Sequence, residues 1–489
     1  MAAKEFIVAI ELGSSKITGI AGKKGIDGSI QVLAVVKEDA TSCIRKGVVY
    51  NIDKTSVCLT NIIKKLKTLL KSEISRVYVG MGGQSIRSIR NTIVKTLPED
   101  SVVTQDIINE LMDNNRSMSY PDQEILDAAT QEYKVGTQYQ IDPVGITCSK
   151  LEGNFLNILC RKQFFRNLNK CFENANITIA ELYLAPIALA HSVLTDVEKR
   201  TGSLLVDLGA DTTTVALYHK NILRHLAVIP LGSNNVTKDI ANVLQIEEKD
   251  AETMKLEYAQ ALTDPNDIEE EKHYRVDDER SVSQQEFVDI VEARVNEIIQ
   301  NVWYQVPSDY KNKLMGGIVL TGGGSNMKKV KEAFADYTKI TKVRIANTVI
   351  PNVTSTDKDV NAHNGMMNTV IGLLAKGDLN CAGQAIAKPD LFGEQAPATN
   401  TPAESGKPFR KPGETEPGVV MTAKEKEAFE EERRRKAEEA RRLAEEERRA
   451  QEQRDKDTRE GKGFFDKFKK QMKEFTTKLI SEETDEDNK

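Results

Sequence analysis

The stretch GSLLVDLGADTTTVALYH, residues 202–219, places an apolar strand, an acid, a glycine turn rich in hydroxyl groups and a second apolar strand in succession. The stretch FIVAIELGSSKITGIAG, residues 6–22, follows the same order near the N-terminus. One such hairpin alone is better explained as an ordinary turn with a polar tip. Two copies instead indicate duplicated halves, whose turns direct N–H groups and hydroxyls at one polyphosphate while the acids hold a hydrated magnesium ion.

A third glycine turn lies in GGIVLTGGGSNMKKV, residues 316–330, where a buried strand leads through three glycines and a serine into a helix. Backbone without side chains can approach a nucleotide closely at a helix N-terminus. Glycine-rich connections between strands and helices are also common without any ligand. The three turns together, rather than any one of them, predict a nucleotide site.

Composition divides the chain into a folded part and a solvated part. Up to about residue 376, short β-branched runs alternate with amphipathic helical stretches, which is an α/β pattern. Residues 377–422 are rich in Pro, Gly, Ala, Thr and Glu, which predicts a disordered linker. Residues 423–460 contain no Pro or Gly and place Glu four positions before a basic residue repeatedly, typical of a solvated helix. A coiled coil is the alternative, but only Phe429 and Leu443 are large and apolar there.

Charge and cysteine content exclude several classes of protein. The 489 residues carry a net charge of −6 with a pI near 5.7, which argues against nucleic acid as a partner because phosphate binding normally needs a basic domain. The six cysteines form no C-x-x-C pair, which predicts reduced, buried thiols and no zinc site. The N-terminus leads directly into a strand, and no window of about 18 residues is apolar and uncharged. We therefore expect a cytoplasmic protein that contacts any membrane from its surface.

The order and spacing of the three turns resemble the two phosphate motifs and the adenosine motif of the actin, Hsp70 and sugar-kinase superfamily. Flanking stretches are similar to FtsA, the actin-like bacterial cell-division family. They are AELYLAPIALAHSVLTDVEKRTGSLLVDLG, IPLGSNNVTKDIANVLQIEEKDAETMKLEYAQAL, QQEFVDIVEARVNEIIQNV and AHNGMMNTVIGLLAKG. The most specific likeness is that of residues 76–162 to the extra subdomain that FtsA carries and actin lacks.

The resemblance implies a two-lobed actin-like ATPase fold of the α/β class, with duplicated lobes and an FtsA-type extra subdomain, followed by a disordered linker and a helical tail. The expected divisions are 1–75 and 163–205 for the core of the first lobe, 76–162 for the extra subdomain, 206–232 and 317–376 for the core of the second lobe, 233–316 for its outer subdomain, 377–422 for the linker, 423–460 for the charged helix, 461–480 for an amphipathic membrane-binding helix and 481–489 for an acidic tip.

The resemblance also implies ATP and Mg²⁺ as ligands, with Glu11 and Asp207 as the metal residues. The nucleotide-binding residues that it implies are Gly13, Ser14, Ser15, Lys16, Asp207, Gly209, Thr212, Thr213, Gly232, Glu252, Lys255, Gly322, Gly323, Gly324 and Ser325. Glu252 and Lys255 stand where relatives hold the ribose and base. A plain solvent-exposed helix face is the alternative for these two residues.

Several positions depart from the family pattern and bear on hydrolysis. The first acid is Glu11 instead of Asp, and the second turn carries Ala210 and Asp211 where glycines are usual. Asp211 either assists a cation or repels the phosphates. Ala185 stands where relatives carry a carboxylate or an amide that positions water, and His191 is expected to be a packed helix residue rather than a substitute base. We expect ATP binding with slow or negligible turnover.

The tail contains one segment that is apolar on a single face, GFFDKFKKQMKEFTTKLI, residues 463–480. At about 100° per residue, its large apolar side chains share one narrow face of a helix and its lysines lie outside that face. This pattern predicts an interfacial helix on anionic lipid, with docking into a protein groove as the alternative. The residues concerned are Phe464, Phe465, Phe468, Met472, Phe475 and Leu479, with Lys467, Lys469, Lys470 and Lys473.

The leading interpretation, implied by the resemblance, is an ATP-binding division protein that polymerises on the cytoplasmic side of the inner membrane at the septum. It tethers the C-terminal tail of FtsZ and recruits later division proteins. Arg294 in the outer subdomain is a plausible contact to that acidic tail, and an internal ion pair with Glu297 or Glu292 is the alternative. A small-molecule kinase is the enzyme alternative, although residues 20–200 show no clear base for it. An Hsp70-type chaperone would need a β-sandwich domain where the linker stands.

Overall fold

A computed structural model describes residues 5–99, 101–269, 271–277, 280–383 and 418–422, with eight positions between 425 and 445 and residues 469–473. The chain forms two units, Met1–Thr422 and Ala423–Lys489.

The first lobe is built on a mixed sheet. Strands β1 (Ile7–Leu12), β2 (Lys16–Lys24) and β3 (Ile30–Asp39) form an antiparallel meander. The parallel strands β6 (Val77–Met81) and β11 (Ile179–Leu184) extend it on the side of β1. The resulting order is β3-β2-β1-β6-β11.

The second lobe repeats this sheet. Strands β12 (Ser203–Leu208), β13 (Thr213–His219) and β14 (Ile222–Ile229) form the meander, and β17 (Gly317–Thr321) and β18 (Val343–Ile345) follow in parallel. The order β14-β13-β12-β17-β18 matches that of the first lobe strand for strand. The predicted duplication is therefore confirmed.

Helices cover both faces of the first-lobe sheet. A Cβ atom added at Gly19 of β2 would meet Ile62 of α1, whereas one added at Gly80 of β6 would meet Leu373 of α12. The register through β1 puts these two glycines on opposite faces, so each lets a helix approach closely. The helices that pack in this lobe are α1 (Ile52–Leu70), α3 (Lys162–Asn174), α4 (Ala185–Val193) and α12 (Asn368–Lys376).

Two boundaries of the lobes differ from the sequence-based expectation. Strand β6 lies inside the first-lobe sheet, although the expected boundary at residue 76 assigns it to the extra subdomain. All five of its residues are buried, because the sheet is covered on both faces. Helix α12 and strand β19 (Val353–Thr354), expected in the second lobe, pack on the first, where β19 pairs with β3.

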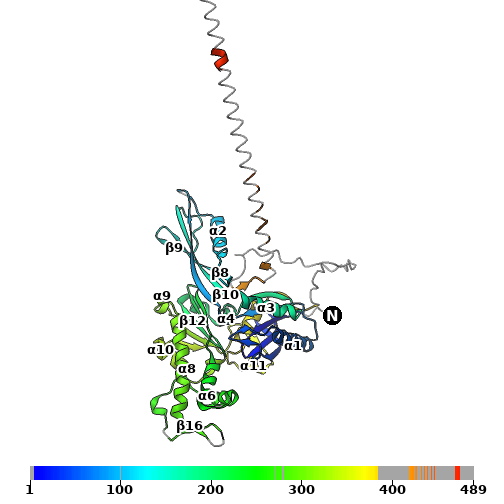
Figure 1. Cartoon of the computed structure of the whole chain (residues 1–489), viewed down its shortest axis with the longest axis vertical. Coiled ribbons are helices and arrows are strands. Elements are labelled where there is room, and N and C mark those ends of the chain that lie inside the picture. Colours follow the sequence, from blue (N-terminus) through cyan, green and yellow to red (C-terminus); the bar gives the residue numbers. More distant parts are fainter. Residues whose placement is uncertain are drawn as a thin grey trace, which may run out of the picture. The chain divides into compact units, whose positions relative to one another are not determined.

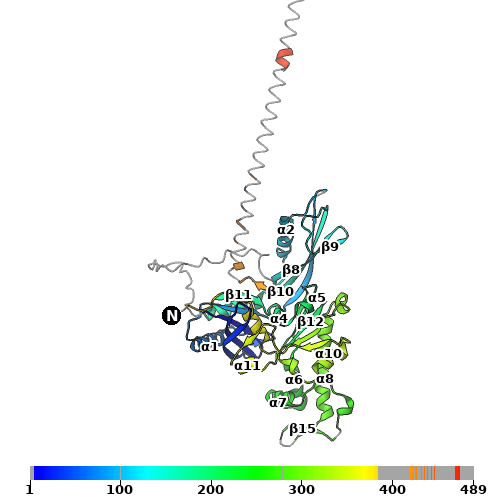
Figure 2. The ribbon, with the colours of Figure 1, turned by 180° about the vertical axis from the view of Figure 1, so that it is seen from behind.

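The extra subdomain and the outer subdomain lie at opposite ends of the first unit (Figure 1 and Figure 2). The extra subdomain packs a helix against an antiparallel sheet around a small core that includes Leu111 and Phe155. Its elements are β7 (Arg87–Thr96), α2 (Gln105–Arg116), β8 (Gln123–Val135), β9 (Gln138–Gln140) and β10 (Lys150–Arg161). The outer subdomain contains α6 (Ser233–Leu244), α7 (Glu248–Tyr258), β15 (His273–Arg275), β16 (Ser281–Ser283) and α8 (Gln284–Gln305).

Both ends of the expected linker belong to the folded unit. The Tyr78 hydroxyl accepts hydrogen bonds from the N–H groups of Asp378 and Leu379, at 3.1 and 2.9 Å. Strand β20 (Val419–Val420) pairs with β11. Residues 384–417, the middle of that expected linker, lie outside the described residues.

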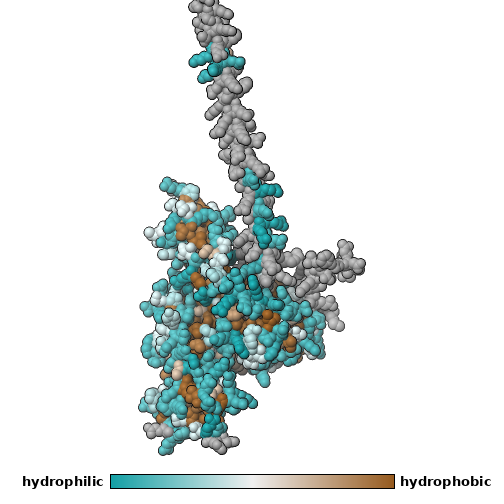
Figure 3. All heavy atoms as spheres, viewed as in Figure 1, coloured by the Kyte–Doolittle hydropathy of each residue, from teal (hydrophilic) through white to brown (hydrophobic). Residues whose placement is uncertain are grey.

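The second unit is described only in part. The described positions between 425 and 445 have helical backbone and are hydrophilic (Figure 3). Residues 469–473 are also helical, and Met472 is 56% exposed. The other predicted membrane-facing residues lie outside the described residues, namely Phe464, Phe465, Lys467, Phe468, Phe475 and Leu479. Among the described helices, none has the length and apolar character needed to cross a membrane.

All six cysteines are free. Cys58 and Cys148 are half-buried, and the other four are buried as expected.

Candidate functional site

The first two turns have the same geometry. The N–H of Gly13 donates to the carbonyl of Lys16 at 3.1 Å, and the N–H of Gly209 donates to the carbonyl of Thr212 at 2.9 Å. A Cβ atom at either glycine would lie 2.8 Å from that same carbonyl oxygen, so only glycine fits. Each turn therefore presents its polar side chains at the end of a central strand.

Two acids stand at equivalent places before these turns. Glu11 lies opposite Thr18 in the β1–β2 register, and Asp207 lies opposite Thr214 in the β12–β13 register. Burial, and then the negative charge of Asp207, raise the pKa of Glu11 to about 8, while the charge of Lys16 opposes this rise. Burial raises the pKa of Asp207 to about 6. The charge of Asp207 thus acts on Glu11 across the lobes, and a bound cation would favour the ionised form of both carboxyl groups.

The third turn approaches the second acid very closely. Gly322 follows β17 with a φ of +84°, and a Cβ atom there would lie 2.3 Å from Oδ1 of Asp207. The Ser325 hydroxyl donates to the carbonyl of Gly322 at 2.7 Å, which ties the turn together from inside. The backbone of the third turn thus reaches the acid of the second because it has no side chain.

Residues of the three turns line one cavity of about 410 Å³ between the lobes. Its size is that of a small-ligand site. Of the predicted site residues, it is lined by Glu11, Gly13, Ser14, Ser15, Lys16, Asp207, Gly209, Thr212, Glu252, Lys255, Gly322, Gly323 and Gly324. Thr213, Gly232 and Ser325 do not line it. The Thr213 hydroxyl donates instead to the carbonyl of Leu231 at 2.9 Å, and Gly232 precedes α6 as its N-cap.

Lys255 is held in a polar network at the wall of the cavity. Its buried ammonium donates to Glu252 at 2.6 Å, to the Thr237 hydroxyl at 2.9 Å and to the carbonyl of Ser233 at 3.3 Å. Glu252 and Lys255 therefore do not form the plain solvated helix face that was the alternative. The network fixes the Glu252 carboxylate beside the cavity.

Asp211 accepts hydrogen bonds from residues of both lobes. Its carboxylate accepts from the side chain of Asn234 at 2.8 Å and from the N–H of Lys46 at 3.2 Å. It is not among the residues that line the cavity, although its partner Asn234 is. Beside it, the N–H of Gly47 donates to the Ser14 hydroxyl at 2.8 Å. Sequence reasoning missed the hydrogen bond between Lys46 and Asp211, which joins the two lobes, because the turn at residues 46–47 carries no motif.

Ala185 lines the cavity at the first position of α4. Its methyl group can neither accept nor donate a hydrogen bond, so this side chain does not orient water. His191 lies on the same helix and is half-buried.

The residues fit ATP and Mg²⁺. Backbone N–H groups, hydroxyls and the Lys16 ammonium face the same space as two carboxylates, and Mg²⁺ is commonly bound by one or two carboxylates together with phosphate oxygens and water. Among the described residues no cluster of three His, Cys, Asp or Glu side chains forms a metal cage. A cation here would therefore need oxygen ligands from the nucleotide and water.

Glu11→Gln is expected to flatten the pH dependence of stability. Because the pKa of Glu11 is raised, the folded protein without ligand loses stability as the pH rises from about 5 to about 9. The amide cannot ionise, so the free energy of unfolding of the variant should fall by less over this range. The difference from the wild type should be at least about 1.4 kcal/mol, which corresponds to one pKa unit. Thermal unfolding across the range measures it, with Glu99→Gln at an exposed site as control. Parallel curves for wild type and Glu11→Gln would contradict the prediction.

The duplicated lobes and the cavity closed by turns from both define the class as the actin-like ATPase fold. A chain in the solved PilM–PilN type IV pilus biogenesis complex matches with a TM-score of 0.54 and 13% identity, over 75% of this chain and 97% of that one. At such identity the likeness concerns the fold alone.

Comparison of sequences narrows this class. Residues 204–372 match the family model of cell division protein FtsA, and residues 83–159 match that of the SHS2 domain inserted in FtsA. Cell division protein FtsA of Pseudomonas aeruginosa is 31% identical over 334 residues, 67% of this chain and 80% of that protein. That of Escherichia coli K12 is 28% identical over 388 residues, 76% of this chain and 90% of that protein. The chain belongs to the FtsA family of cell-division proteins, as its sequence predicts.

Proposed function

We propose that this protein is an ATP-dependent adaptor that assembles into filaments on the inner membrane and tethers FtsZ to it during bacterial division. The observation that carries the proposal is the cavity between the duplicated lobes, where the turns at Gly13, Gly209 and Gly322 converge. A ligand bound by both lobes fixes their relative position, and this supports coupling between nucleotide binding and assembly.

ATP is the proposed ligand, with Mg²⁺ held by Glu11, Asp207 and the phosphates. Lys16 and the turn N–H groups would balance the phosphate charge. Gly322 and its neighbours would approach the adenosine, and the Glu252 carboxylate beside the cavity would accept from the ribose. With Ala185 at the helix start, we expect turnover to be slow or negligible, because no side chain at that position aligns the attacking water.

Self-association into filaments is supported by the surface of the extra subdomain. Apolar side chains gather there on the face shown in Figure 3. Its exposed large apolar residues are Val94, Val102, Met118, Tyr139, Ile141 and Val144. Clusters of this kind often mark contacts between proteins.

The C-terminal tail of FtsZ is the proposed partner of the outer subdomain, but Arg294 is already paired. Its guanidinium donates to Asp239 of α6 at 2.5 and 3.0 Å and also to Glu297. The internal ion pair with Glu297 is thus present. Glu292 instead accepts from the N–H of Thr263 at 2.5 Å.

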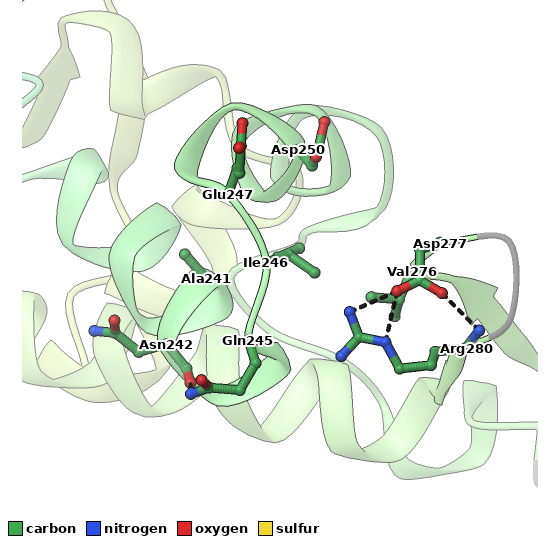
Figure 4. A pocket seen from close by; sticks show the side chains of 9 residues that line it. All are labelled: Ala241, Asn242, Gln245, Ile246, Glu247, Asp250, Val276, Asp277 and Arg280. Carbon is green, nitrogen blue, oxygen red and sulfur yellow. Dashed lines mark hydrogen bonds and ion pairs between the residues drawn. The ribbon is translucent and has the colours of Figure 1, made fainter.

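A hollow of about 470 Å³ in the same subdomain lies between α6, α7 and the β15–β16 hairpin (Figure 4). Glu247, Asp250 and Asp277 line it, and Arg280, the single cation among its described lining residues, pairs with Asp277 at 2.5 Å. An acidic peptide would meet repulsion there, so the proposed FtsZ contact belongs elsewhere on this subdomain.

Arg294→Ala is expected to lower the stability of the outer subdomain by about 1 to 2 kcal/mol, because it removes a two-pronged ion pair that joins α6 to α8. Asp239→Ala should cost a similar amount, and the double variant should cost less than the sum. Urea unfolding measures all three. Unchanged stability with lost binding of an FtsZ tail peptide would instead make Arg294 a partner contact.

Attachment to the cytoplasmic side of the inner membrane at the septum is proposed for residues 461–480. Met472, in the described helical part of this segment, is an apolar side chain that is 56% exposed, and this supports the proposal. Recruitment of later division proteins would follow from assembly at the septum.

The experiment that tests this function is sedimentation of the purified protein with anionic vesicles, with and without Mg·ATP. We expect ATP to increase both sedimentation with lipid and filament formation. ATP-dependent phosphorylation of sugars, or an ATPase stimulated by peptides without any lipid binding, would overturn the proposal in favour of a kinase or a chaperone.

A further inference from the structure

The outer edge of the first-lobe sheet is covered by a segment from the far end of the expected linker. Strand β20 runs antiparallel to β11, with Val420 opposite Leu182 and Val419 opposite Tyr183. The N–H of Leu184 donates to the carbonyl of Gly418 at 2.7 Å. The segment therefore adds a short strand to β11.

The same segment is held from the other side by the extra subdomain. The N–H of Gly418 donates to Oδ2 of Asp127 on β8 at 2.8 Å, while Oδ1 of Asp127 accepts from the N–H of Ala128 at 2.8 Å. Asp127 is half-buried. Desolvation raises the pKa of its carboxyl group, while the two N–H groups and the charge of the nearby Arg116 favour the ionised form. Gly418 therefore links two parts of the unit. Its carbonyl is bonded to the first lobe, and its N–H is bonded to the extra subdomain.

The docking position is selective for sequence. Gly418 has a φ of +93°, and a Cβ atom there would lie 2.9 Å from Cγ2 of Ile187. Val420 is only 3% exposed. An occupant must therefore offer a glycine followed by residues that accept a strand conformation, with an apolar side chain two positions after the glycine. GVVMT, residues 418–422, is such a run within polar sequence.

We propose that the edge of β11 together with Asp127 is a strand-docking site, and that the chain's own residues 418–422 occupy it reversibly. Reversibility follows from the small size of the contact. A strand of two residues with one fully buried side chain gains little more than the conformational entropy that its ordering removes. Without this segment, the edge of β11 is an open row of backbone hydrogen-bond donors and acceptors.

Docking also decides where the charged tail leaves the folded unit, because residue 423 follows the segment directly. When the segment is docked, a pull on the tail acts on both the first lobe and the extra subdomain. When it is released, a pull on the tail no longer acts at this edge, and the β11 edge is open. The inference does not depend on the proposed function, and its test needs no nucleotide, lipid or partner.

Hydrogen exchange of the full-length protein, read by mass spectrometry, tests the proposal. We expect the amides of residues 419–422 and of Leu184 to exchange at least about tenfold more slowly in the wild type than in Gly418→Val, which cannot adopt the docked backbone. They should still exchange faster than the amides of β1. The Asp127→Asn variant, which keeps one acceptor oxygen, should give an intermediate loss and serves if Gly418→Val folds poorly.

Gly383→Val is the matched control, because Gly383 also has a positive φ, of +119°, but no atom within 4 Å of an added Cβ. It should leave the exchange of residues 419–422 unchanged. Equal exchange of these amides in the wild type and in both docking-site variants would overturn the docking site. Exchange as slow as that of β1 would overturn its reversibility.

Discussion

Replacing Gly322 with alanine is expected to abolish binding of Mg·ATP. The new Cβ atom would lie 2.3 Å from Oδ1 of Asp207 and 2.7 Å from the carbonyl of Leu208. Both distances are shorter than van der Waals contact, so the third turn or the Asp207 carboxylate must move. Movement of either separates the proposed metal ligand from the proposed adenosine turn. We expect affinity to fall at least about 100-fold, which corresponds to about 2.7 kcal/mol, as measured by calorimetric titration.

Gly28→Ala separates this steric effect from backbone strain. Gly28 has a φ of +80°, nearly that of Gly322, but no atom lies within 4 Å of an added Cβ. Both variants therefore carry the strain of alanine in the left-handed region, and only one carries the clash. Gly28→Ala should bind Mg·ATP like the wild type. Equal affinity of the two variants would show that the approach of Gly322 to Asp207 is not needed for binding.

The duplicated strands could be predicted because their pattern is local. Each acid lies one residue before the end of a six-residue strand and two before its glycine, and this spacing is visible without a structure. Spacing also predicted that the turns of both lobes meet at one cavity. The depth of Asp207 and Glu11, which raises their pKa values, depends on the packing of both lobes and not on either hairpin.

The sequence predicts less well where an element lies when its position depends on packing against distant parts of the chain. Helix α12 comes after the strands of the second lobe in the sequence, yet it packs on α4 of the first lobe. Gly372 permits this close approach, because an added Cβ would lie 2.5 Å from the Ser192 hydroxyl. Strand β20 has two residues, too few for a period to emerge. Of the two partners of Arg294, Glu297 was among the predicted alternatives, whereas Asp239 was missed because it is 55 positions away on another helix.

Phe468→Glu is expected to abolish sedimentation with anionic vesicles while leaving Mg·ATP binding unchanged. In the helix that the sequence predicts for residues 463–480, Phe468 would lie at about 40° on an apolar face that extends from about 0° to about 100°, taking Phe464 as zero. Burial of one large apolar side chain contributes roughly 1.5 to 3 kcal/mol, of which partial insertion and helix ordering remove a part. We therefore expect a single helix to bind weakly, and a glutamate within its face to remove most of that affinity.

In the proposed filament, many copies would multiply weak attachment through effective concentration, so a loss per copy would be amplified in the assembly. Thr477→Glu is the control matched in charge, and in the predicted helix position 477 would lie at about 220°, opposite the apolar face. It adds the same negative charge to the same lysine-rich segment, and it should reduce sedimentation only modestly and more at low salt. Equal losses from both variants would mean that net charge, and not an inserted apolar face, holds the protein on lipid. Full sedimentation of Phe468→Glu would exclude this helix as the membrane anchor.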